Sequence, residues 1–139
     1  MLIQASVENE RQRHSVVLTT DGNAHSIAIS PRTSGFGSST NGGELLCLAM
    51  ATCYCNDLYR EAQKRAIEVV RVEVHALAEF GDPGAPASQL SYRVTVSARA
   101  PEPEIQALIL HTDSVSEVQN TLRRGMSVEL KSFTVSTVP

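Results

Sequence analysis

Three cysteines lie within nine residues of one another, at Cys47, Cys53 and Cys55. On an α-helix, which turns about 100° per residue, Cys53 and Cys55 point about 160° apart, and Cys47 and Cys53 about 120° apart. Cys47 and Cys55 are closer in angle but lie about 12 Å apart along the helix axis. Because no pair can form a disulfide within one helix, we expect a reduced, cytoplasmic protein with free thiols.

Cys53 is the candidate for a reactive thiol. It lies where the segment from Leu45 to Cys55, apolar on every side apart from two hydroxyls, changes to a polar segment. Its local neighbours do not activate it, because Asp57 opposes a thiolate and Arg60 lies about 10 Å along the axis. The alternative is that all three cysteines are small core residues, as buried cysteines usually are.

The elements around the cysteines predict an α+β fold in one domain over residues 1–139. Asn41 and Glu44 form a capping-box pattern at the start of a long helix, and a helix that is apolar all round is buried in the fold or in a subunit interface. Apolar residues from Val70 to Phe80 alternate with polar ones, which predicts a half-buried strand in an antiparallel hairpin. The expected elements are strands at 2–7, 14–20 and 24–30, a helix at 44–66, strands at 69–80 and 90–98, helices at 105–111 and 115–122, and a final strand at 126–138.

Composition excludes several classes of protein. The net charge of −3 and the absence of a Lys/Arg cluster argue against nucleic-acid binding. No stretch of eighteen uncharged apolar residues is present, so we expect no membrane span. The cysteines and histidines lack zinc-type spacing, and no glycine loop matches a phosphate-binding pattern, so we expect no metal and no cofactor.

The sequence from Thr40 to Leu45 and from Ala51 to Tyr54 resembles the helix of the osmotically inducible protein C and organic hydroperoxide resistance (OsmC/Ohr) family. The family pattern is roughly Asn-Pro-Glu-x-Leu, five residues, then Ala-Ala-Cys-Phe, and the order of elements fits along nearly the whole chain. The resemblance implies an OsmC-like fold, in which an antiparallel sheet packs around a long, central, buried helix in an intertwined homodimer. It also implies a thiol peroxidase that reduces organic hydroperoxides.

The resemblance assigns roles to individual residues. Cys53 matches the peroxidatic cysteine, whereas Ser116 stands where the family has its resolving cysteine, so a catalytic cycle would need an external thiol reductant. The glutamate that helps to activate the thiol falls on Gly43, with Glu44 one position further on. For the activating arginine, Arg13 is the best match.

Other residues near the motif are candidates for contacts with a substrate. Arg32 in the glycine-rich loop is a second candidate for the arginine, and Met50 lies on the same helix face as Cys53. Asn56 either hydrogen-bonds a thiolate or substrate, or only marks the start of the solvated half of the helix. Cys55 either pairs across a dimer axis or is a small buried residue.

Two functions remain open at this point. The first is a one-cysteine peroxidase for organic hydroperoxides in oxidative-stress defence, which predicts a lowered Cys53 pKa with a cation beside the thiol. The second is a non-catalytic dimeric protein that binds a small apolar ligand, which predicts an ordinary buried thiol and an open apolar pocket. A redox sensor made of Cys53 and Cys55 is a third, weaker hypothesis.

Overall fold

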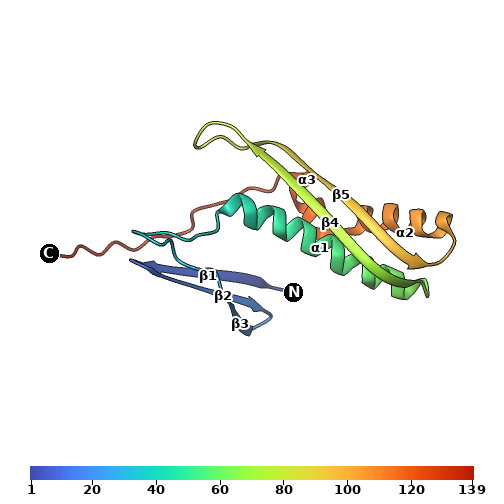
Figure 1. Cartoon of the computed structure of the whole chain (residues 1–139). Coiled ribbons are helices and arrows are strands. Elements are labelled where there is room, and N and C mark those ends of the chain that lie inside the picture. Colours follow the sequence, from blue (N-terminus) through green and yellow to red (C-terminus); the bar gives the residue numbers. More distant parts are fainter. The chain divides into compact units, whose positions relative to one another are not determined.

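The computed structural model describes residues 1–139, which divide into two compact units, Met1–Leu48 and Ala49–Pro139. The α+β class and the order of elements are as predicted up to the last helix (Figure 1). None of the helices combines the length and apolar character that a membrane crossing requires. The elements are β1 (Ile3–Glu10), β2 (Arg13–Thr20), β3 (Asn23–Ile27), α1 (Gly42–Lys64), β4 (Glu68–Phe80), β5 (Ala87–Arg99), α2 (Glu102–Val115) and α3 (Glu117–Arg124).

The first unit contains an antiparallel sheet in the order β1-β2-β3. Asp21 and Gly22 form the turn between β2 and β3 with φ values of 47° and 82°, which are the positive values that a two-residue hairpin turn needs. The turn predicted from these two residues is therefore confirmed. β3 ends at Ile27, three residues earlier than expected.

The capping box at the start of α1 is also confirmed. The backbone N–H of Glu44 donates to Asn41 Oδ1 at 2.9 Å, and the backbone N–H of Asn41 donates to Glu44 Oε2 at 2.8 Å. These two bonds satisfy backbone donors that a helix N-terminus leaves free. They explain why α1 begins directly after the glycine-rich loop.

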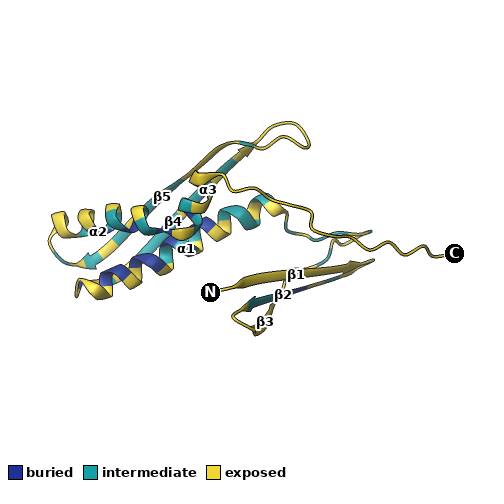
Figure 2. Cartoon of the chain, turned by 180° about the vertical axis from the view of Figure 1, so that it is seen from behind, coloured by how far each residue is buried: buried dark blue, intermediate teal, exposed yellow.

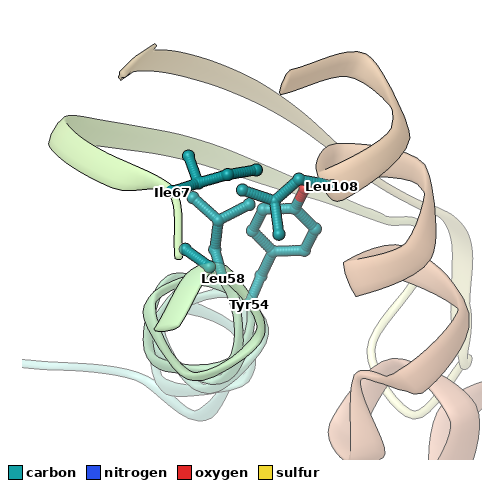
Figure 3. Close-up of a cluster of buried hydrophobic side chains, with 5 residues drawn as sticks. Tyr54, Leu58, Ile67 and Leu108 are labelled. Atoms are coloured by element: carbon teal, nitrogen blue, oxygen red, sulfur yellow. The ribbon is translucent and has the colours of Figure 1, made fainter. Parts of the chain in front are cut away.

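The second unit has its core between α1, the β4–β5 hairpin and α2. Tyr54, Leu58 and Ala62 face one side of α1 and pack with Ile67 and Leu108 (Figure 3). Figure 2 shows the buried part of α1 as a stripe rather than a whole surface. The expectation of a helix buried all round is thus not met within this chain, since Leu48 is 58% exposed.

The β4–β5 hairpin is antiparallel as predicted, but one end of its inward face differs from the expectation. A register shift between Val69 and Arg71 places an extra residue in β4. The shift leaves Val70 58% exposed and turns Val69 toward the core. Phe80 follows a second shift and is exposed as well. Strict alternation cannot reveal such a bulge, because the extra residue reverses the side-chain phase.

The end of the chain contains one correction. α2 is longer than the helix predicted at 105–111, and α3 begins and ends two residues later than the helix predicted at 115–122. Gly125 ends α3 with a φ of 62°, as expected of a C-terminal glycine. The predicted strand at 126–138 is wrong for this structure, because residues 126–139 form no strand. Their alternating apolar side chains are exposed, and no neighbouring strand pairs with them.

Candidate functional site

Side chains from α1 and α3 converge around Cys53. Cys53, Asp57, Arg60 and Glu61 follow one another at spacings of four, three and one residues, which places them along one face of α1. Glu117, the first residue of α3, reaches the same face. The cluster lies entirely within the second unit.

The Cys53 thiol is a hydrogen-bond donor to carboxylates. Its Sγ lies 3.3 Å from Asp57 Oδ2 and 3.9 Å from Glu117 Oε2. Burial raises the pKa of the Cys53 thiol, and the negative charges of Asp57 and Glu117 raise it further, against a lowering by the backbone N–H of Val118. This site therefore stabilises the protonated thiol over the thiolate.

Arg60 neutralises the carboxylates rather than the sulfur. Its guanidinium lies 2.8 Å from Asp57 Oδ1, 3.0 Å from Glu61 Oε1 and 3.4 Å from Glu117 Oε1. No bond from Arg60 to Cys53 Sγ is present. The expectation that Arg60 does not reach Cys53, while Asp57 opposes its thiolate, is borne out by these contacts.

Glu61 extends the cluster toward α2. Lys64 Nζ lies 2.8 Å from Glu61 Oε1, and His111 Nε2 lies 3.2 Å from Glu61 Oε2. The hydrogen bonds from Lys64 and Arg60 lower the pKa of Glu61 to about 2. Glu61 is therefore a carboxylate throughout the ordinary pH range, and it links α1 to α2.

Three potential metal ligands meet in this cluster. The ligand atoms of Cys53, Asp57 and Glu117 all lie within 4.8 Å of one another. Thiolate and carboxylate oxygens are ligands that Zn²⁺ accepts. The Arg60 guanidinium already binds both carboxylates, however, so an ion would have to compete with Arg60 for them.

Ser116 cannot take the part of a resolving thiol. It is fully buried at the junction of α2 and α3, and its Oγ donates to the Thr112 carbonyl at 2.9 Å. A hydroxyl forms no disulfide. Cys55 and Asn56 line a separate, shallow hollow of about 260 Å³. All three cysteines are free thiols.

The remaining residues assigned by resemblance belong to the first unit. Arg13 lies 3.3 Å from Glu8 and 3.4 Å from Glu10. Arg32 Nε donates to the Ser38 carbonyl at 3.4 Å. Glu44 is the capping partner of Asn41, so its carboxylate has a local structural role within this unit.

A cavity of about 410 Å³ opens between α1, β5 and α3 in the second unit. Met50, predicted as a substrate contact, is one of its lining residues and lies one helical turn before Cys53. The Tyr92 hydroxyl donates to Asp113, which Arg123 also contacts at 2.6 Å. The lining residues are Met50, Leu90, Ser91, Tyr92, Gln119, Leu122 and Arg123.

The fold and this site define an α+β protein with a cysteine on a long helix and a mainly apolar cavity that Met50 of the same helix lines. The sequence model of the family described as OsmC-like protein matches residues 35–131. The chain therefore belongs to the OsmC-like family. No curated protein matches its sequence.

Solved structures with the same fold cover most of the chain. An OsmC-like protein from Mycoplasma pneumoniae is 16% identical, with a TM-score of 0.59, over 86% of this chain and 87% of its own. An OsmC-like protein of unknown function from Vibrio cholerae is 14% identical, with a TM-score of 0.57, over 87% and 93%. The organic hydroperoxide resistance protein OsmC from Legionella pneumophila is 20% identical, with a TM-score of 0.52, over 88% and 90%. At these identities the likeness shows the fold alone.

Sequence reasoning did not single out Glu117, Gln119 and Arg123. Glu117 meets Cys53 across 64 residues of sequence, and such a contact depends on how α3 folds back on α1. One local signal was present, because Glu117 and Gln119 closely follow Ser116, which the resemblance placed at the position of the resolving cysteine. Of these residues, Glu117 contacts the thiol and Gln119 lines the cavity.

Proposed function

We propose that this OsmC-like protein binds a small, mainly apolar molecule in the cavity lined by Met50, Tyr92, Gln119 and Leu122. The cavity of about 410 Å³ carries the proposal. Its volume lies within the range of roughly 300–1,000 Å³ that is usual for ligand sites. Its apolar walls come from three different elements, and its few polar groups converge from β5 and α3.

The groups around Cys53 favour its protonated thiol, which supports ligand binding rather than peroxide reduction as the function. Thiol peroxidases attack with the thiolate, which must be stabilised by a nearby cation or helix N-terminus. In the second unit the backbone N–H of Val118, at the N-terminus of α3, does lower the pKa of Cys53, but burial and the Asp57 and Glu117 carboxylates outweigh it and raise that pKa. Arg60, the cation closest in sequence, is bound by three carboxylates.

A one-cysteine peroxidase is the second candidate, favoured by the position of Cys53 in the family motif and by its incomplete burial. In that reaction the Cys53 sulfur attacks the O–O bond of a hydroperoxide. The products are a sulfenic acid and an alcohol, and the alcohol receives the thiol proton, which Asp57 is placed to relay. Two molecules of an external thiol then restore Cys53 and leave as a disulfide with one water.

One mass-spectrometric experiment separates the two functions. Reduced protein is treated with one equivalent of cumene hydroperoxide and with dimedone, which traps sulfenic acids, alongside the Cys53→Ser variant. We expect no rapid dimedone adduct on the wild-type protein. An adduct that forms rapidly and disappears in Cys53→Ser overturns the proposal in favour of the peroxidase.

Binding itself is tested with N-phenyl-1-naphthylamine, an apolar dye that fluoresces when it leaves water. We expect saturable fluorescence with the wild-type protein and its loss in Leu122→Trp, because the larger side chain fills the cavity. Leu110→Trp is the matched control, since Leu110 is exposed on α2 and does not line this cavity. Equal dye binding by both variants contradicts the proposed site.

We also propose that the protein is a cytoplasmic homodimer. The support is the set of apolar side chains that the single chain leaves exposed on α1 and in residues 126–138. Leu48 on α1 is 58% exposed, and Val128 is 97% exposed. Large apolar side chains that are left exposed in this number are typical of surfaces that bind another protein chain.

A further inference from the structure

Three side chains from α1 and α3 hold their donor atoms at distances that suit a metal ion. Cys53 Sγ lies 3.3 Å from Asp57 Oδ2 and 3.9 Å from Glu117 Oε2, and all three atoms lie within 4.8 Å of one another. In a tetrahedral zinc site, with Zn–S and Zn–O bonds of about 2.3 and 2.0 Å, sulfur and oxygen ligand atoms lie about 3.5 Å apart. The two sulfur–oxygen distances lie on either side of this value. Glu117 is exposed, so its side chain is free to adjust and an ion can enter from solvent.

Arg60 uses one oxygen of each carboxylate, and the other oxygen of each faces the sulfur. The guanidinium lies 2.8 Å from Asp57 Oδ1 and 3.4 Å from Glu117 Oε1. The oxygens near Cys53 Sγ are Asp57 Oδ2 and Glu117 Oε2. An ion therefore competes with Arg60 for the charge of the carboxylates but not for the same oxygen atoms. Arg60 also orients both carboxylates, as hydrogen bonds to metal ligands commonly do.

The charge of the connected groups matches one divalent cation. The negative groups, with the Cys53 thiol ionised, are Cys53, Asp57, Glu61 and Glu117, and the positive groups are Arg60 and Lys64. His111, which contacts Glu61, is counted as neutral. The thiolate form therefore has an excess of two negative charges. A proton on the sulfur removes one of them, whereas a divalent ion removes both.

We propose that Cys53, Asp57 and Glu117 form a binding site for a divalent transition-metal ion, of which Zn²⁺ fits the donor set best. Thiolate sulfur suits Zn²⁺, whereas Mg²⁺ and Ca²⁺ prefer sites made of oxygen ligands alone. Binding forms a bond between the ion and Cys53 Sγ and breaks the S–H bond, whose proton leaves to solvent. Three protein ligands leave the fourth tetrahedral position to water.

This site is separate from the cavity in which we propose that an apolar molecule binds, because none of its three ligands lines that cavity. The expectation of no metal rested on the spacing of cysteines and histidines. Two of the ligands proposed here are carboxylates, and Glu117 follows Cys53 by 64 residues. Such a set of ligands produces no local sequence pattern.

Cobalt(II) is the probe for this site, because its bond to a thiolate gives a charge-transfer absorption in the near ultraviolet. Reduced wild-type protein is expected to develop this band on titration with CoCl₂ and to lose it on addition of ZnCl₂, but not of excess MgCl₂. Cys53→Ser is expected to abolish the band. Glu117→Gln is expected to raise the Kd for Co²⁺ by about tenfold or more, since losing even a group that supports a metal ligand has an effect of this size. Cys55→Ser and Glu104→Gln are the matched controls and keep the wild-type band and Kd.

A second measurement uses only wild-type protein and therefore does not depend on the folding of any variant. Zn²⁺ is expected to slow the alkylation of Cys53 by iodoacetamide and to leave the rates of Cys47 and Cys55 unchanged, with tandem mass spectrometry locating the modified residue. The absence of a cobalt band in wild-type protein, or a band that persists in Cys53→Ser, overturns the proposed site. Alkylation of Cys53 at the same rate with and without Zn²⁺ overturns it as well.

Discussion

The chemistry of Cys53 is decided by which atoms surround its sulfur. The thiol hydrogen-bonds to Asp57 at 3.3 Å, and Glu117 lies 3.9 Å away. Both carboxylates act in the same direction as burial and raise the pKa of the thiol. A cysteine in the family's peroxidatic position thus has surroundings that oppose the thiolate within its own unit.

Asp57→Asn is expected to make Cys53 more reactive, because it removes the nearer negative charge and offers the sulfur an amide donor. Each unit by which the pKa of the thiol falls raises its thiolate fraction at neutral pH by about tenfold. The rate of alkylation by iodoacetamide reports this change, measured in a Cys47→Ser/Cys55→Ser background so that only Cys53 reacts. Glu104→Gln, an exposed acidic position on α2, is the control and leaves the rate unchanged. An unchanged rate in Asp57→Asn would show that Asp57 does not restrain the thiol.

At the scale of elements, Glu61 joins α1 to α2. Lys64, Arg60 and His111 all contact its carboxylate, and the contact with His111, the one partner on α2, links the two helices. The hydrogen bonds from Lys64 and Arg60 lower the pKa of Glu61 from an ordinary 4.5 to about 2. A carboxyl whose pKa is lower in the folded state stabilises the fold above its unfolded pKa and loses that effect as the pH falls through its folded pKa.

Glu61→Gln is therefore expected to lower the Tm at neutral pH, and the difference from wild type is expected to shrink as the pH falls from about 4.5 toward 2. Thermal unfolding followed by circular dichroism at a series of pH values measures this. Glu104→Gln again serves as the control and should follow the wild-type curve. A Tm difference that stays constant across this pH range would place the stabilising role of Glu61 in packing rather than in its charge.

For the whole molecule, features that depend on neighbouring residues could be predicted from the sequence, whereas the contacts of the site between distant residues could not. The Asp21-Gly22 turn and the Asn41–Glu44 capping box were predicted because each needs only a few adjacent residues. The contact of Cys53 with Glu117 was missed because it depends on how α3 folds back on α1. The bulge after Val69 was missed because an alternation of apolar and polar residues does not show where an extra residue is inserted into a strand.

The prediction of a final strand at 126–138 was wrong for a different reason, and that reason concerns how the protein assembles. The segment after Gly125 keeps a strand-like alternation, with Met126, Val128 and Leu130 on one side and Ser127, Glu129 and Lys131 on the other. A strand needs a neighbour to satisfy its backbone hydrogen bonds, and residues 126–139 pair with no strand of this chain. The alternation therefore favours a neighbour supplied by a second copy of the chain.

The proposed homodimer predicts that sedimentation equilibrium gives twice the chain mass of 15.0 kDa. Val128→Lys combined with Leu130→Lys places charges on the apolar side of the segment and is expected to shift the protein to monomer at micromolar concentration. Ser127→Lys combined with Glu129→Lys adds the same side chains to the polar side and should leave the dimer intact. A monomeric wild-type protein contradicts the assembly. A dimer that survives both double substitutions shows that its interface lies elsewhere, which directs attention to the exposed Leu48 side of α1.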